Sequence, residues 1–113
     1  MEKLFELSYS LHDKLLETDE YHKLQEATKK MFDNKESKRK IDDYNKMMEI
    51  YSNNKSNDNQ KRLHEAKLVM DNDLLVIEYK KAYKNYQLLL SNITSICFDG
   101  FSEESLFDKI IKG

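Results

Sequence analysis

Apolar residues recur every three or four positions along the chain, and the pattern is longest between residues 73 and 98. Two apolar lines run side by side there. The first alternates spacings of four and three through Leu75, Tyr79, Ala82, Tyr86, Leu89, Ile93 and Ile96. The second repeats every seven residues through Val76, Tyr83, Leu90 and Cys97. Such spacings place side chains on one face of a helix. The face is broad enough to predict two partners, a helix of the same chain and a helix of a second chain.

Shorter segments with the same period predict further helices, and capping residues predict where they begin. A first helix is expected over about residues 2–16, with a leucine at every third or fourth position. Thr18 is interpreted as the N-cap of a second helix. Asp33, with Glu36 three residues later, is interpreted as a capping box that opens a third helix. Asn72 is interpreted as the N-cap of the long helix.

The clearest break is the segment of residues 52–60, which contains no apolar residue and is predicted to form the tip of a helical hairpin. Gly100 is expected to end the long helix, and Ser102 to cap a short helix over residues 102–112. The predicted fold is therefore all-α. It is a single domain over residues 1–113 with its core in 4–97, an antiparallel bundle of five or six helices with long hairpins that dimerises through helix-helix packing.

Composition supports a helical chain and restricts its location. Among 113 residues there is no proline and no tryptophan, and glycine occurs twice, so the turns that a strand-rich domain requires are missing. The single cysteine excludes an internal disulfide framework and favours a reducing cytoplasm. Acidic residues near the N-terminus argue against a secretory signal, and no membrane span is expected. The predicted location is the cytoplasm.

Side chains that could carry chemistry do not form a recognisable set. His12, His22 and His64 have no metal-ligand spacing, and no nucleophile–base pair can be argued. Cys97 is expected to be a small buried apolar residue, because one thiol cannot hold an iron–sulfur cluster alone. Whether it contributes one ligand to a site shared between chains stays open. The chain is predicted to be no enzyme and to use no cofactor.

Two clusters of cations suggest an alternative function. They are Lys35, Lys38, Arg39 and Lys40, followed by Lys80, Lys81 and Lys84. Such a cluster could contact RNA or an acidic partner, or could simply be a solvated helix face. The net charge of −2 favours neither choice, although a dedicated duplex-DNA binder is usually clearly basic.

The order of several diffuse helix patterns resembles the YlbF/YmcA family of small helical regulators from low-GC Gram-positive bacteria. The resemblance covers roughly residues 4–97. The residues that carry it most clearly are Thr18-Asp19-Glu20-Tyr21 at the start of a helix and, after the polar break, Glu65-Ala66-Lys67 and Tyr79-Lys80-Lys81-Ala82. Some members of the family carry a cysteine-rich tail that is associated with iron–sulfur binding. This sequence has no such tail.

The resemblance implies a function in regulation. Members of this family act with a partner called YaaT as specificity factors for the endoribonuclease RNase Y, and affect competence, biofilm formation and sporulation. The resemblance therefore implies a non-enzymatic adaptor that forms a homodimer, or a heterodimer with a helical paralogue, within a ribonuclease-associated complex. The alternative is a nucleic-acid-binding module that uses the lysine-rich faces. A dimeric enzyme is the third possibility, and no catalytic set supports it.

Overall fold

The computed structural model describes residues 1–99, which form five α-helices and no strand. The predicted all-α class is therefore confirmed for this part of the chain. The expected helix over 102–112, with Gly100 and Ser102 before it, lies outside the described residues. The helices are α1 (Glu2–Leu16), α2 (Asp19–Asp33), α3 (Lys35–Asn53), α4 (Asn57–Asp71) and α5 (Leu74–Cys97).

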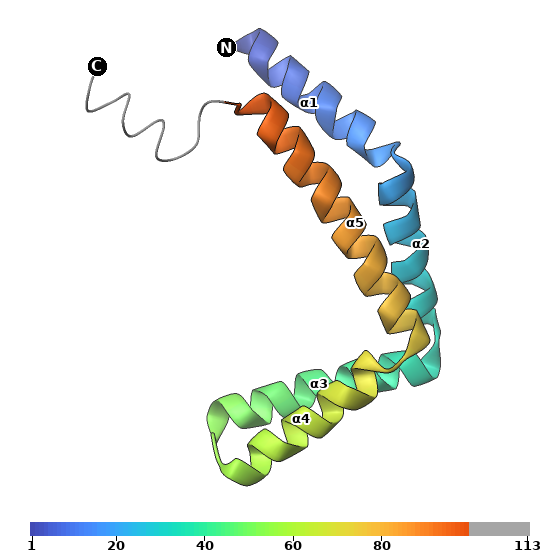
Figure 1. Cartoon of the computed structure of the whole chain (residues 1–113), viewed down its shortest axis with the longest axis vertical. Coiled ribbons are helices and arrows are strands. Elements are labelled where there is room, and N and C mark those ends of the chain that lie inside the picture. The colour runs from blue at the N-terminus through green and yellow to red at the C-terminus, as the bar shows by residue number, and fades with distance from the viewer. Residues whose placement is uncertain (100–113) are drawn as a thin grey trace, which may run out of the picture.

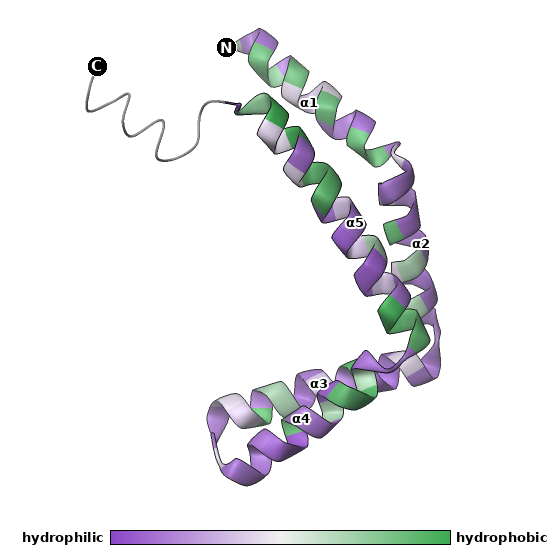
Figure 2. Cartoon of the chain, in the orientation of Figure 1, coloured by the Kyte–Doolittle hydropathy of each residue, from purple (hydrophilic) through white to green (hydrophobic). Residues whose placement is uncertain are grey.

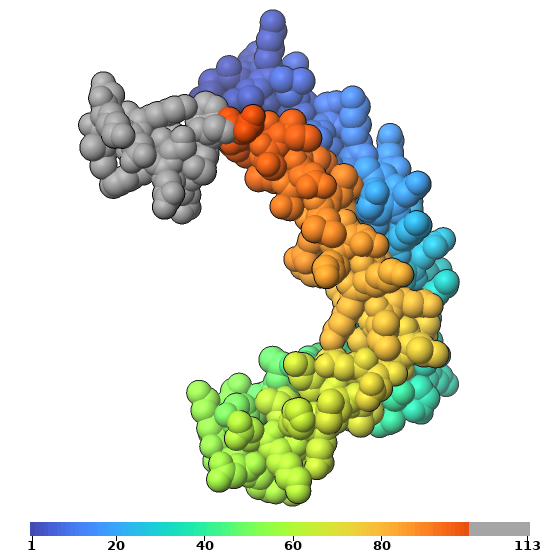
Figure 3. Space-filling model, viewed as in Figure 1, coloured from blue at the N-terminus to red at the C-terminus, as the bar shows by residue number. Residues whose placement is uncertain are grey.

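The helices form two pairs rather than one bundle around a central axis. α4 returns along α3, α5 returns along α2, and the two pairs meet at an elbow (Figure 1). The space-filling view shows the resulting curved outline (Figure 3). The Cα radius of gyration is 20.1 Å, whereas a compact domain of about 100 residues has a radius near 13 Å. The fold is therefore elongated, and within residues 1–99 each of α2 to α5 packs mainly against one other helix.

The small hydrophobic core lies at the elbow, where the two pairs meet. Met31 of α2, Met70 of α4 and Val76 of α5 are its buried residues. The apolar beginning of α5 can be followed at this joint in Figure 2. Half-buried side chains pack around the core, namely Ile41, Tyr44, Leu75 and Tyr79. Three of the five helices thus contribute buried apolar side chains to one joint, and α1 contributes none.

The structure confirms the predicted N-cap of the second helix and corrects that of the third. Thr18 is the N-cap of α2, and its hydroxyl accepts a hydrogen bond from the Tyr21 N–H at 3.3 Å, which confirms the prediction. The assignment of Asp33 was wrong, because α2 continues through this residue. Asn34 is the N-cap of α3 instead, with its side-chain oxygen 3.0 Å from the Ser37 N–H. Asp and Asn have nearly the same preference for the N-cap position, so residue type alone could not decide between Asp33 and Asn34.

The polar break is much shorter than the predicted segment of residues 52–60. α3 runs to Asn53, and only residues 54–56 connect it to α4. The Ser56 hydroxyl accepts a hydrogen bond from the Asn59 N–H at 3.1 Å, and the Asn59 side chain donates to the Asn54 carbonyl at 2.9 Å. The capping hydrogen bonds therefore let a segment without apolar residues begin a helix.

Candidate functional site

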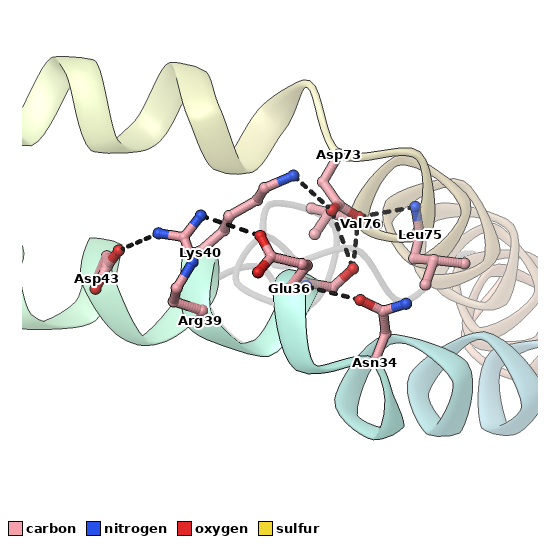
Figure 4. Close-up of polar contacts among 9 residues, drawn as sticks. Asn34, Glu36, Arg39, Lys40, Asp43, Asp73, Leu75 and Val76 are labelled. Atoms are coloured by element: carbon pink, nitrogen blue, oxygen red, sulfur yellow. Dashed lines mark hydrogen bonds and ion pairs between the residues drawn. The ribbon is translucent and has the colours of Figure 1, made fainter.

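A buried carboxylate holds the elbow together. Asp73 is 9% exposed and lies between α4 and α5. The Ser37 hydroxyl, 1% exposed, donates to the two carboxylate oxygens at 2.9 and 3.0 Å. The Lys40 ammonium lies 3.1 Å from the same carboxylate (Figure 4). Because Ser37 and Lys40 belong to α3, these contacts fasten one helix pair to the other.

Asp73 is also the N-cap of α5, so the assignment of that role to Asn72 was wrong. The Asp73 carboxylate accepts hydrogen bonds from the N–H groups of Leu75 at 2.9 Å and Val76 at 3.1 Å. Asn72 instead ends α4, in a right-handed helical conformation. An acid at this position satisfies free N–H groups and interacts favourably with the positive end of the helix dipole.

The surroundings of Asp73 stabilise its charged form. Burial alone would raise the pKa of this carboxyl group. The hydrogen bonds from Ser37, Lys40 and the Val76 N–H, together with the positive charge of Lys40, outweigh burial and hold the pKa below its ordinary value. Every buried side-chain polar atom in residues 1–99 has a hydrogen-bond partner. No buried side-chain polar atom of this network is unpaired, and its hydrogen bonds join α3 to the beginning of α5.

The predicted interface residues of α5 are used largely within the chain. Tyr86 contacts Tyr21 of α2, with ring centroids 5.7 Å apart. Leu75 and Tyr79 pack against the core. The half-buried members of the predicted line are Leu75, Tyr79, Ala82, Tyr86, Leu89 and Ile93. Ile96 differs from them, because it is 77% exposed. The partner of this line in the structure is α2, and its use by a second chain stays a prediction.

The predicted cationic residues do not form one free surface. Arg39 pairs with Glu36 at 3.2 Å and with Asp43 at 3.0 Å. Lys80 pairs with Asp71, and Lys40 belongs to the elbow network described above. The remaining cations are exposed, divided between α3 and α5: Lys35, Lys38, Lys81 and Lys84. Four of the seven predicted cations are therefore free of ion pairs among residues 1–99, in the first turns of α3 and in the first half of α5.

A groove between α3 and α4 brings together residues that the sequence pattern did not connect. Tyr44 and Tyr51 of α3 line it on one side, and Lys61, His64 and Lys67 of α4 line it on the other. Its volume is about 520 Å³. Tyr44 and Tyr51 share the apolar line of α3 with Ile41 and Met48, so the sequence favours packing over base stacking for these tyrosines. The spacing of three between the α4 residues was the signal available in the sequence.

Cys97 is exposed, contrary to the expectation of a small buried residue. It lies in the last turn of α5, beside Ile96, where α2 no longer covers the helix. Among residues 1–99, no three His, Cys, Asp or Glu side chains are grouped so that they could hold a metal ion. An iron–sulfur site would therefore need further ligands from another chain or from outside this range.

We expect the Cys97 thiol to react quickly with a thiol reagent in the folded protein, because the side chain is accessible. Cys97→Ala is expected to change the free energy of unfolding by no more than about 0.5 kcal/mol, as for other exposed positions. Thiol titration with and without denaturant, and urea unfolding of both proteins, measure these effects. A visible iron–sulfur absorption band that vanishes in Cys97→Ala would contradict a cofactor-free chain.

The fold and the elbow define a small, elongated all-helical protein with a charged joint between two helix pairs. No helix within residues 1–99 has the length and apolar character that crossing a membrane requires. A family model described as "Control of competence regulator ComK, YlbF/YmcA" matches residues 4–101. The chain belongs to this family, as its helix patterns predicted. No curated protein and no solved structure matches the chain.

Proposed function

We propose that the protein is a non-enzymatic regulatory adaptor of the cytoplasm. It associates with a second copy or with a helical paralogue, and it modulates an RNA-processing complex of the RNase Y type. Through mRNA maturation it affects competence, biofilm formation or sporulation. Family membership supports a regulatory function in competence. The RNA-processing complex and the wider effects are proposed from the resemblance described above.

The observation that carries the adaptor function is the surface that the chain leaves uncovered. The accessible surface is 9469 Å², whereas a compact monomer of 13.5 kDa exposes about 6500 Å². The excess of roughly 3000 Å² is more than one side of a standard interface, which covers about 800 Å² per partner. Large apolar side chains contribute to it on every helix. A chain with this surface is suited to form permanent contacts with other proteins.

The proposed function is tested by removing the gene and mapping the 5′ ends of cellular mRNAs. We expect specific transcripts to accumulate unprocessed, with bulk mRNA decay unchanged. The wild-type gene and the Cys97→Ala variant should both restore processing. A tagged chain should copurify with an endoribonuclease and a helical paralogue. Unchanged 5′ ends in the deletion strain would overturn the proposal.

The groove between α3 and α4 favours nucleic-acid binding as a second candidate function. Tyrosine rings can stack on unpaired bases, and the ammonium groups of Lys61 and Lys67 on the facing helix can neutralise phosphates. The groove adds aromatic rings to the lysine-rich faces as a place where RNA would bind, and two of the lysines on those faces, Lys40 and Lys80, are engaged in ion pairs.

Salt separates the two candidate functions. Binding of single-stranded RNA through this groove would weaken steeply between low and high salt, since counterions are released from phosphates. Tyr51→Ala and Lys61→Ala would each weaken it, and Lys35→Ala is the matched control outside the groove. Apolar association of protein chains would change little over the same range. The absence of RNA binding at low salt excludes the second candidate.

A further inference from the structure

α1 carries an apolar stripe that the rest of the described chain does not cover. Leu4, Leu7 and Leu11 lie at spacings of three and four, so they share one face of the helix. Leu4 is 63% exposed and Leu7 is 68% exposed. No residue of α1 is buried, and its main contact is with α2, which follows it directly. Isolated helices of about 15 residues are marginal in water, so α1 needs a packing partner.

We propose that the leucine stripe of α1 packs against the same stripe of a second copy of this chain, which makes α1 the assembly arm of a two-fold symmetric dimer. The proposal rests on the self-association included in the proposed function and names its surface. The predicted seam of α5 already packs against α2, whereas α1 offers an apolar face that the other described residues leave uncovered.

The chemistry of the stripe explains why a second copy fits it. A two-fold axis brings a patch against itself, so the patch must be complementary to its own copy. A charged patch would repel its copy, but leucines attract one another without regard to sign. Ser8, which neighbours the stripe, donates its hydroxyl to the Leu4 carbonyl at 2.9 Å. It therefore requires no polar partner across the interface.

The surroundings of the stripe extend the apolar contact. Ile96 and Phe98, at the end of α5, are also exposed. The end of α5 and the N-terminal part of α1 both lie at the tip of the α2–α5 pair that points away from the elbow (Figure 1). A second copy docked on α1 can therefore cover this tip as well. Each chain exposes roughly 3000 Å² more than a compact monomer, spread over its helices, and a standard interface covers only about 800 Å² of each partner.

The test is the mass of the purified full chain over a concentration series, measured by sedimentation equilibrium. We expect a dimer at micromolar concentration. Leu7→Glu is expected to raise the dissociation constant roughly 100-fold or more, because each dimer would bury two unpaired charges. Leu7 is exposed in the monomer and Glu is a good helix former, so the variant should keep its helical circular dichroism. Tyr9→Glu, on another face of α1, is the matched control and should remain dimeric.

Cross-linking gives a second measurement that does not depend on affinity. Cys97→Ala removes the only cysteine, and adding Ser8→Cys then places one thiol beside the stripe. We expect oxidation to join two chains through this thiol, whereas Asn45→Cys on the distant α3 should not cross-link. A dimer that tolerates Leu7→Glu and fails to cross-link overturns the α1 proposal alone. A monomeric wild type overturns self-association as well, and a dimer that appears only after truncation at Asp99 would assign the stripe to residues 100–113.

Discussion

Replacing Asp73 with alanine is expected to lower the free energy of unfolding by about 3 kcal/mol. The change removes the N-cap of α5 and leaves the Ser37 hydroxyl and the Lys40 ammonium without their acceptor. A lost cap costs about 1 kcal/mol, and a buried donor without a partner adds about 1–3 kcal/mol. Urea unfolding followed by far-UV circular dichroism measures the loss. Small-angle scattering of the folded fraction reports whether the elbow opens.

Two conservative variants separate the contributions that the N-cap and the ion pair of Asp73 make to the free energy of unfolding. Asp73→Asn keeps a side-chain oxygen for the cap and removes the charge that pairs with Lys40. Ser37→Ala removes one donor and leaves the cap intact. Each should lose less stability than Asp73→Ala. Equal stability of Asp73→Ala and the wild type would show that the elbow does not depend on this carboxylate.

The lowered pKa of Asp73 predicts a pH dependence with a definite sign. A carboxyl group whose folded pKa lies below its unfolded value of about 3.9 stabilises the fold at higher pH. This contribution is fully present above the unfolded pKa and is lost as the pH falls through the folded pKa. We expect the wild type to lose more stability than Asp73→Asn on acidification below about pH 4. Parallel acid titrations of the two proteins would contradict the lowered pKa.

Met31→Ala is expected to lower the free energy of unfolding by about 3 kcal/mol, since truncation of a buried methionine leaves a cavity. Met31 is 3% exposed and lies in the core at the elbow with Met70 and Val76. Few other buried side chains support this core, so the fold has little to compensate for the cavity. Urea unfolding of the variant and the wild type at equal protein concentration measures the difference.

The volume-conserving change Met31→Leu is the matched control and should cost less than about 1.5 kcal/mol. Leu68→Ala removes an apolar group of similar size from a position that is about half exposed, and should cost less than Met31→Ala. If Leu68→Ala proves the more damaging change, the exposed side of α4 is covered in solution. That result would indicate a second interface beside α1.

Local physical chemistry determined the helices of this protein and, less closely, where they begin. The helical period of the leucines and the cap at Thr18 depend on residues within one or two turns, so the sequence contained the whole signal. The cap assignments at Asp33 and Asn72 missed by one residue each, because Asp and Asn differ little in capping strength. The polar segment of residues 52–60 was misjudged because capping hydrogen bonds replaced the apolar pattern.

Tertiary structure decided which partner each helix face meets. The line from Leu75 to Ile96 showed that α5 packs against something, but only the fold identified α2 as that partner. The elbow joins Asp73 to residues 33 and 36 positions earlier, Lys40 and Ser37, and a contact at that separation leaves no periodic trace in the sequence. Which side chains share one face of a helix depends on residues three and four positions apart in the sequence. Which helix packs against that face depends on how all the helices together bury their apolar side chains.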